Sequence, residues 1–126
     1  MSAVMDASAI MAIANDEPGG DFVRRRLAGS KMSLVNAIEV GTKLMDKGFS
    51  SDEAWGALEL LDITLVDLDA ELATAAIALR EQTREKGLSL ADRTCLALAI
   101  REGLSAVTAD RAWATLNLPC KIELIR

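Results

Sequence analysis

The sequence contains no histidine and no tyrosine among its 126 residues. Without histidine, the chain cannot build a catalytic triad that depends on an imidazole, nor a histidine-rich zinc site. A glycine-rich phosphate loop is missing too, because the stretch PGGD at 18–21 has neither the spacing nor the lysine of a P-loop. The side chains that remain for chemistry are mainly carboxylates.

Cysteine is scarce, and long apolar runs are missing. Cys95 and Cys120 stand far apart and form no CxxC pattern, so we expect both to be reduced and structural. No apolar run approaches the roughly 20 residues that a membrane-spanning helix needs, and the N-terminus lacks the basic start and apolar stretch of a signal peptide. We therefore expect a soluble, cytoplasmic protein with no membrane contact.

Hydrophobic residues make up 51% of the chain, which argues against disorder. The length favours one domain, 1–126, that is large enough to bury a core. The formal net charge of −5 disfavours a broad nucleic-acid-binding face, although it leaves room for a local one.

Short apolar segments alternate with helical patterns along the chain. Predicted strands lie at 2–6, 31–34, 63–68, 105–110 and 121–125. Predicted helices lie at 7–14, 21–27, 36–48, 51–61, 69–87 and 90–103, with one or two helical turns at 111–117. The segment 69–87 is the longest of these helices, and 90–103 is apolar almost all the way round, as expected of a buried helix. The alternation predicts an α/β fold with three layers, in which a central, mostly parallel, Rossmann-like sheet of four to five strands lies between helices.

Asp6 and Asp110 each follow a short apolar strand and precede a helical segment. In an open parallel sheet the carboxyl ends of the strands face the ligand crevice, so the two acids are expected at the same edge. Aspartate is also a good helix N-cap, and either residue alone fits that simpler role.

Two further acids lie on predicted helices, Asp92 at the start of the buried helix and Glu39 within an earlier one. Asp92 shares one side of the buried helix with Cys95 and Leu96, where an unpaired carboxylate is costly. Either the helix dipole stabilises it, or a metal or basic partner does. Glu39 falls away from the apolar stripe of its helix, which fits an exposed face and also the wall of a cleft.

The order and spacing of these four acids resemble those of the PIN-domain family, and within it the VapC-like ribonuclease toxins of bacterial toxin–antitoxin pairs. The resemblance covers essentially the whole chain. It rests on VMDASAI at 4–10, SLVNAIEV at 33–40, LSLADRTCLALA at 88–99 and AVTADRAW at 106–113. It implies a single PIN domain with a three-layer α/β/α fold and a metal-dependent endoribonuclease activity.

On that resemblance four acids carry over as the catalytic metal site: Asp6, Glu39, Asp92 and Asp110. The first and third are expected to bind the metal directly, and the other two through water or by orienting the attacking water. Four carboxylates without histidine or cysteine favour Mg²⁺ or Mn²⁺ over zinc.

Smaller polar residues accompany the acids. Ser8 and Thr108 match the hydroxyl residues beside the first and last acids of the family. Asn36 stands where threonine is frequent, three residues before Glu39, and so bears on the orientation of that carboxylate. Trp113 stands where phenylalanine is frequent.

An RNA substrate requires positive charge near these acids. The densest basic cluster predicts phosphate contacts beside the acidic crevice, although a solvated helix face explains it equally: Arg24, Arg25, Arg26 and Lys31. Arg93 and Arg111 each follow a site acid directly, and either clamp phosphates or pair with neighbouring acids.

The resemblance also implies a cognate antitoxin and a homodimer. Trp55, Leu58 and Leu61 lie on a helix that so small a domain is expected to leave partly uncovered, and such patches mark interfaces. We therefore expect a homodimer and an apolar groove among the early helices that takes an antitoxin segment.

Two other classes compete with the enzyme. One is a non-catalytic PIN-like module that binds protein or RNA, in which the acids are caps and salt-bridge partners. The other is a receiver-like phospho-acceptor domain, which requires a second acid beside Asp6 and a lysine after a late strand. The sequence has neither.

Overall fold

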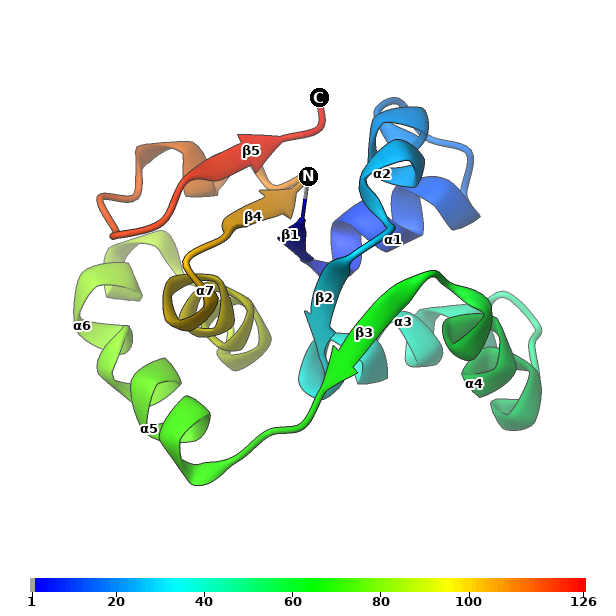
Figure 1. Cartoon of the computed structure of the whole chain (residues 1–126), viewed down its shortest axis with the longest axis horizontal. Coiled ribbons are helices and arrows are strands. Elements are labelled where there is room, and N and C mark those ends of the chain that lie inside the picture. The colour runs from blue at the N-terminus through cyan, green and yellow to red at the C-terminus, as the bar shows by residue number, and fades with distance from the viewer. Residues whose placement is uncertain (1) are drawn as a thin grey trace.

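A five-stranded parallel sheet forms the centre of the computed structural model, which describes residues 2–126 (Figure 1). The strand order is β3-β2-β1-β4-β5, and every hydrogen-bonded pair of neighbours is parallel. The strands are β1 (Ala3–Met5), β2 (Ser30–Ser33), β3 (Ile63–Val66), β4 (Ser105–Thr108) and β5 (Ile122–Leu124). The predicted α/β fold with a mostly parallel sheet is confirmed.

Helices connect the strands and cover the sheet. They are α1 (Ala7–Ala14), α2 (Gly20–Arg26), α3 (Leu34–Asp46), α4 (Ser51–Leu60), α5 (Ala70–Ala78), α6 (Arg80–Thr83) and α7 (Leu90–Glu102), with 3-10 turns η1 (Arg84–Lys86) and η2 (Arg111–Thr115). No helix within residues 2–126 is long and apolar enough to cross a membrane.

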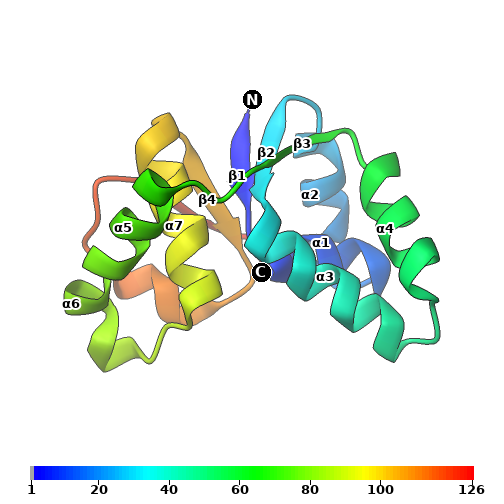
Figure 2. The same ribbon diagram turned by 90° about the horizontal axis from the view of Figure 1, so that it is seen from below.

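The side chains of β1 alternate between two halves of the core, as strand geometry requires. Ala3 and Met5 belong to the cluster that packs against α1 to α4, whereas Val4 belongs to the cluster that packs against α5 and α7. Figure 2 shows the resulting layers, with α1 to α4 on one face of the sheet and α5 to α7 on the other. The predicted three-layer arrangement is therefore confirmed.

The helix predicted as apolar all round is α7, and it is buried along most of its length. Ser89 begins it with a capping box, and Gly103 ends it in the left-handed conformation, with φ of 66°. Both signals satisfy backbone groups at the helix ends that would otherwise lack partners. The helix thus holds its first turn, which carries Asp92, in a fixed place against the sheet.

The single long helix predicted over 69–87 is wrong, because the segment divides into α5, α6 and η1. The buried Thr83 hydroxyl donates to the carbonyl oxygen of Leu79 at 2.8 Å, a side-chain bond that commonly bends helices. Leu79 and Leu88 both pack into the second core cluster, and the bend keeps both against α7. The longest helices are instead α3 and α7, with 13 residues each.

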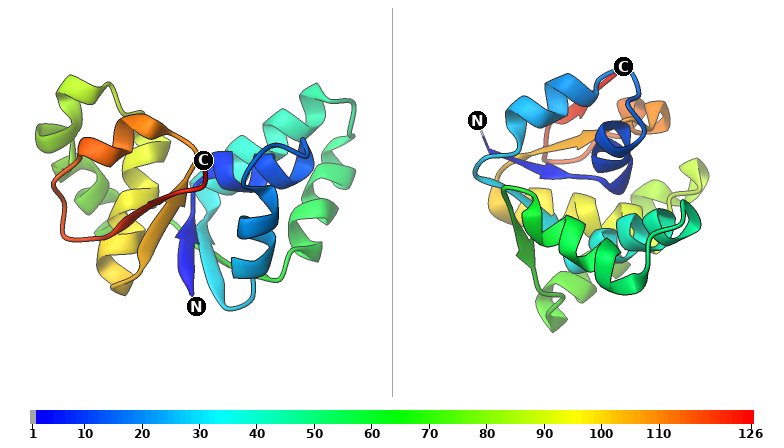
Figure 3. Two further views of the ribbon diagram at one scale, coloured as in Figure 1. Left: turned by 90° about the horizontal axis from the view of Figure 1, so that it is seen from above. Right: turned by 90° about the vertical axis from the view of Figure 1, so that its right-hand side faces the viewer.

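The parallel strands bring their carboxyl ends to one edge of the sheet, which we call the carboxyl edge (Figure 3, left). β1 leads there into α1 through Asp6, β2 leads into α3, and β4 leads to η2 through Asp110. Because α7 runs antiparallel to the strands on its way to β4, its first turn lies near the same edge. Ligand sites of open α/β sheets lie at such edges.

Candidate active site at the carboxyl edge

Asp6 is buried where β1 ends, with 5% of its surface exposed. Its Oδ2 atom accepts hydrogen bonds from the hydroxyls of Ser8, at 2.6 Å, and Thr108, at 2.8 Å. The side chain makes no hydrogen bond to the amides of the first turn of α1, although the residue occupies the N-cap position. The simple cap interpretation therefore does not apply to Asp6.

The same two hydroxyls connect β1 to the end of β4. Ser8 Oγ accepts the backbone N–H of Ala109 at 2.9 Å, and Thr108 Oγ1 accepts that of Asp110 at 3.0 Å. Each hydroxyl thus donates its hydrogen to Asp6 and accepts a backbone N–H from the segment that leads to Asp110. The network fixes one oxygen of Asp6, and its Oδ1 accepts no hydrogen bond from residues 2–126.

Glu39 lies half-buried on α3 and is tied to α7 through Asn36. The fully buried side-chain amide of Asn36 donates to Glu39 Oε1 at 3.3 Å and to the carbonyl oxygen of Ala91 at 3.1 Å. Its Oδ1 accepts from the Ser33 hydroxyl, which also caps α3. Asn36 thus links Glu39 to Ala91, the residue before Asp92. The sequence predicts that Asn36 bears on the orientation of Glu39, and the contact with α7 is an addition from the structure.

Asp92 and Asp110 both have capping roles. Asp92 Oδ2 accepts the N–H of Ser89 at 3.0 Å within the capping box of α7, so the helix end does stabilise it. Asp110 Oδ1 accepts the N–H of Ala112 at 3.0 Å at the start of η2. Each cap uses one carboxylate oxygen, and the other remains for a ligand.

Asp92 lies within electrostatic range of the other three acids, and Glu39 also lies within range of Asp6. Burial raises the pKa of Glu39, and the negative charges of Asp6 and Asp92 raise it further. Burial also raises the pKa of Asp92, with added contributions from Asp6 and Asp110, against a lowering by the Ser89 amide. The structure therefore brings together four acids that the sequence places up to 104 positions apart, as the span from position 6 to position 110 shows.

The fully buried thiol of Cys95 lies under these acids. Burial raises its pKa well above the ordinary value, and the charges of Asp6 and Asp92 add to the effect. A thiol in such surroundings stays protonated and inert. Cys95 and Cys120 are both free cysteines, in agreement with the expected structural role.

No lysine or arginine within residues 2–126 forms an ion pair with any of the four acids. Buried charges in proteins are ordinarily paired, hydrogen-bonded or bound to metals, and the carboxylate of Asp6 has only the hydroxyls of Ser8 and Thr108 as hydrogen-bond donors within residues 2–126. The donor set contains only oxygen, which suits Mg²⁺ or Mn²⁺.

The acids do not stand as a finished metal site. No three of them, within the part of the chain that the structure describes, are close enough to enclose one ion. Asp92 and Asp110 each use one carboxylate oxygen in a capping bond to their own helix.

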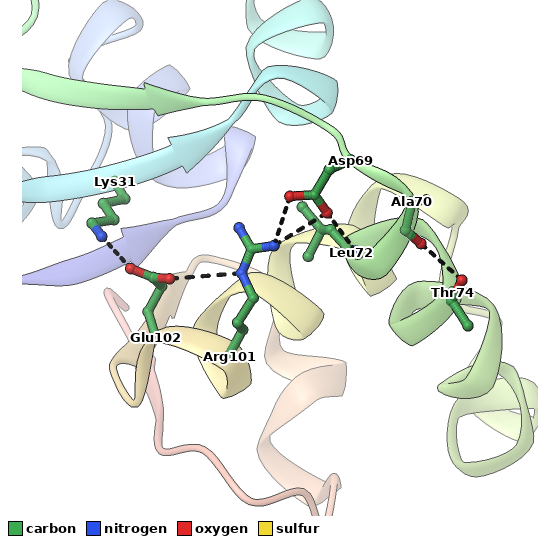
Figure 4. Close-up of polar contacts among 7 residues, drawn as sticks. All are labelled: Lys31, Asp69, Ala70, Leu72, Thr74, Arg101 and Glu102. Carbon is green, nitrogen blue, oxygen red and sulfur yellow. Dashed lines mark hydrogen bonds and ion pairs between the residues drawn. The ribbon is translucent and has the colours of Figure 1, made fainter.

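The basic cluster predicted beside the acids lies instead at the amino edge of the sheet. Lys31, near the start of β2, pairs with Glu102 at the end of α7, ten residues or about 15 Å along the helix from Asp92 (Figure 4). Arg26 pairs with Glu123 of β5 at 2.9 Å, and Arg24 pairs with Asp21. Arg25 lies beside Arg24 and Arg26 in the last turn of α2. This turn precedes the amino end of β2, so these cations do not lie at the carboxyl edge, where phosphate contacts were expected.

The amino-edge ion pairs have a structural role. Arg101 pairs with Asp69, which caps α5, and also with Glu102, so that the network joins β2, α7 and α5 (Figure 4). Lys31 and its partners thus connect the sheet to the helical layer of α5 and α7, and the Lys31 ammonium is used in this ion pair at the amino edge.

The other two basic residues do lie beside site acids in the chain. Arg93 donates to the carbonyl oxygen of Ala76 at 3.1 Å, and its Nε is buried without a partner among residues 2–126. Arg111 is exposed, and its guanidinium donates to the backbone carbonyl of Arg126 at 3.0 Å. Neither forms a pair with an acid, so the phosphate interpretation remains open for both.

Lys43 is a cation that the sequence reasoning missed. It stands four residues after Glu39 on α3, is exposed, and is among the groups that lower the pKa of Glu39 against the larger effect of burial. The signal that would have found it is the i, i+4 spacing, which places both side chains on one helix face.

Comparison with known families and structures identifies relatives of the fold. The model of the PIN domain family matches residues 3–117 of the chain. A search of the curated proteins finds no match.

Several solved structures have a similar fold at low sequence identity. A toxin–antitoxin complex from Klebsiella pneumoniae is 19% identical, with a TM-score of 0.72 over 95% of this chain and 99% of the other. VapC20 from Mycobacterium tuberculosis, a toxin that cleaves the sarcin–ricin loop, is 18% identical, with a TM-score of 0.74 over 91% and 96%. DNA-bound VapBC from Salmonella typhimurium is 19% identical, with a TM-score of 0.71 over the full length of both chains.

Proposed function

This chain belongs to the PIN-domain family, and we propose that it is a metal-dependent endoribonuclease, the toxin of a toxin–antitoxin pair, which cleaves RNA in the cytoplasm. The observation that carries the proposal is the buried, hydroxyl-bound carboxylate of Asp6, which has three further acids around it and no cationic partner within residues 2–126. The similar folds of toxins from toxin–antitoxin complexes support it.

In this proposal Asp6 and Asp92 hold a Mg²⁺ or Mn²⁺ ion, with Glu39 and Asp110 completing the site through water. When bound, the cation offsets the charge that develops on the scissile phosphate and makes an attacking water more acidic. Each of the two direct ligands already has one oxygen fixed, by hydroxyls at Asp6 and by the Ser89 amide at Asp92. This leaves one oxygen of each for the ion.

In the same proposal Glu39 orients the attacking water. Its carboxylate is held by Asn36 through one oxygen, and its other oxygen makes no hydrogen bond to residues 2–126. Asn36 also contacts the backbone beside Asp92, so one buried side chain sets the spacing between the α3 and α7 sides of the site.

Cleavage of total bacterial RNA tests this function, with the new ends mapped by sequencing. We expect defined cuts with Mg²⁺ or Mn²⁺, none with EDTA, and recovery when the metal is restored. Asp6→Asn should lower the rate by orders of magnitude, whereas Asp21→Asn, the same change at an exposed residue of α2, should not. Cuts that persist in EDTA would show that the metal mechanism is wrong.

A non-catalytic binding module is the second candidate, and the capping bonds of Asp92 and Asp110 favour it. In that case both acids serve only their helices. A titration with Mn²⁺, followed by thermal melting, separates the two, because the module would gain no stability from the metal.

An antitoxin is proposed to bind the apolar groove between α3 and α4. The groove has a volume of about 420 Å³ and includes Ile38, Met45 and Trp55, whose side chains are 67%, 49% and 47% exposed. Leu58 lies at its floor and is buried, so the expectation that Leu58 is left uncovered is wrong. An amphipathic helix fits such a groove through apolar residues on one face.

The two tryptophans make this partner testable. Trp113 is fully buried in the core and Trp55 lines the groove, so a change in tryptophan fluorescence on binding reports on Trp55. We expect the product of a neighbouring reading frame, co-expressed with this chain, to shift the emission to shorter wavelength. Unchanged emission in a complex that does form would place the antitoxin elsewhere.

A homodimer remains part of the proposal. Leu68, Ile77 and Leu90 are 49%, 70% and 63% exposed and border a small hollow between α5 and α7. Exposed apolar side chains gathered in this way are typical of an interface. Light scattering at micromolar concentration should give twice the chain mass, and Ile77→Asp should shift it to a single chain.

A further inference from the structure

Lys43 stands beside the candidate active site on the α3 side. It lies one helical turn beyond Glu39, about 6 Å along the helix axis, on the same face. Its side chain is exposed, while Glu39 is half-buried. The lysine therefore lies at the outer margin of the acidic site.

Most basic residues near the sheet are already paired. Arg24, Arg26, Lys31 and Arg101 form ion pairs at the amino edge or within one helix. By contrast, Lys43 forms no hydrogen bond and no ion pair within residues 2–126, and it acts on Glu39 only through its charge at longer range. Its three N–H donors therefore remain for a ligand.

The charges around Lys43 define what that ligand can be. Glu39 lies one turn before it and Asp46 one turn after it, and neither forms an ion pair with it. Lys47, the next lysine on α3, is already bonded to the Asn15 side chain. An RNA strand that approaches four carboxylates meets repulsion, which makes the free cation at their margin important for binding.

We propose that Lys43 binds a phosphate of the RNA strand next to the phosphate that is cut. The inference rests on the proposed nuclease function and adds a substrate-binding residue to it. Lys43 acts on the hold of the strand and does not touch the reacting atoms. Its loss is therefore expected to raise KM and to leave kcat nearly unchanged.

Binding is measured with a 20-nucleotide single-stranded RNA carrying fluorescein, in Mg²⁺, on proteins that all contain Asp6→Asn to prevent cleavage. Adding Lys43→Gln should weaken binding roughly 3- to 10-fold at low salt and reduce the salt slope by about 0.7, the value for one phosphate contact on a single strand. Lys43→Arg should restore affinity to within about twofold, because it keeps the charge.

Lys121→Gln is the matched control, since Lys121 is exposed at the amino end of β5 and the change in net charge is the same. If Lys43→Gln and Lys121→Gln weaken binding equally, net charge alone is responsible and the inference is wrong. In cleavage assays on otherwise native protein, an unchanged KM for Lys43→Gln overturns the inference while the nuclease function stands. A native protein that neither cuts nor binds RNA in Mg²⁺ overturns both.

Discussion

Replacing Asp6 by asparagine tests two properties of the acidic site: the stability that it loses through charge repulsion, and its binding of a metal ion. An asparagine side-chain oxygen can still accept hydrogen bonds from Ser8 and Thr108, so the network at the end of β1 survives. What disappears is a buried negative charge that has other carboxylates near it and no ion pair within residues 2–126. In EDTA the variant should therefore be more stable than the parent.

The size of this effect follows from the charges. Unit charges about 7 Å apart at an effective dielectric constant of about 20 repel by roughly 2 kcal/mol before salt screening. With screening, a gain of about 1–2 kcal/mol is expected. For 126 residues, the unfolding entropy converts about 1 kcal/mol into about 4 °C, so the melting temperature should rise by about 4–8 °C.

A bound metal ion should offset the stability advantage of Asp6→Asn over the parent. At ten times its dissociation constant, a bound cation stabilises the parent by roughly 1.4 kcal/mol, or about 5 °C. Asp6→Asn should gain much less. Asp92→Asn should also lose the response, but should gain less in EDTA, because a negative charge in the first turn of α7 is favoured by the helix dipole.

Melting curves of the three proteins, each with EDTA and with Mg²⁺, test the reasoning. Asp21→Asn serves as the matched control and should keep the parent's metal response. Equal metal-induced shifts in Asp6→Asn, Asp92→Asn and the parent would show that these acids do not form the site. A large loss of stability for Asp6→Asn in EDTA would show that its charge has a structural partner.

Three further changes test other parts of the structure. Asn36→Ala leaves buried polar groups of α3 and α7 without partners and should lower the free energy of unfolding in urea by roughly 2–3 kcal/mol, together with the cleavage rate. Glu123→Gln should lower the free energy of unfolding by roughly 1–2 kcal/mol at pH 7. Because the hydrogen bond from Arg26 lowers the pKa of Glu123, the difference from the parent should vanish as the pH falls through that lowered pKa, which melts at several pH values will test. Gly19→Ala should lose about 2 kcal/mol or more in thermal melts, because its φ is +95° and a methyl group would overlap the backbone and side chain of Ile125, the residue after β5. Gly48→Ala, at φ +108° in open space, isolates the φ effect alone.

The sequence by itself determined most of the fold, because local patterns carried it. Short apolar strands alternated with capped helices, and this pattern specified five strands and the buried α7 within one or two residues. The same reasoning failed over 69–87, where helix-forming residues continue without a break. There the division accompanies the packing of Leu79 and Leu88 in the core cluster of α7, which no local pattern reveals.

The candidate site divides in the same way. The identities of the four acids followed from their order along the chain, together with the resemblance to a family. Only the tertiary structure decided which of them cap helices, that the hydroxyls of Ser8 in α1 and Thr108 in β4 hold Asp6, and that Asn36 bridges Glu39 to α7.

The basic residues show most clearly what required three dimensions. The run Arg24–Arg26 with Lys31 is the densest positive charge in the sequence. It lies at the amino edge of the sheet, whereas the acids lie at the carboxyl edge, at the other end of the parallel strands. Its partners, Glu102 and Glu123, come from distant segments. The sequence by itself determined which residues carry positive charge. The order of the strands and the long-range ion pairs decided which of these cations lie near the acids and which are already paired.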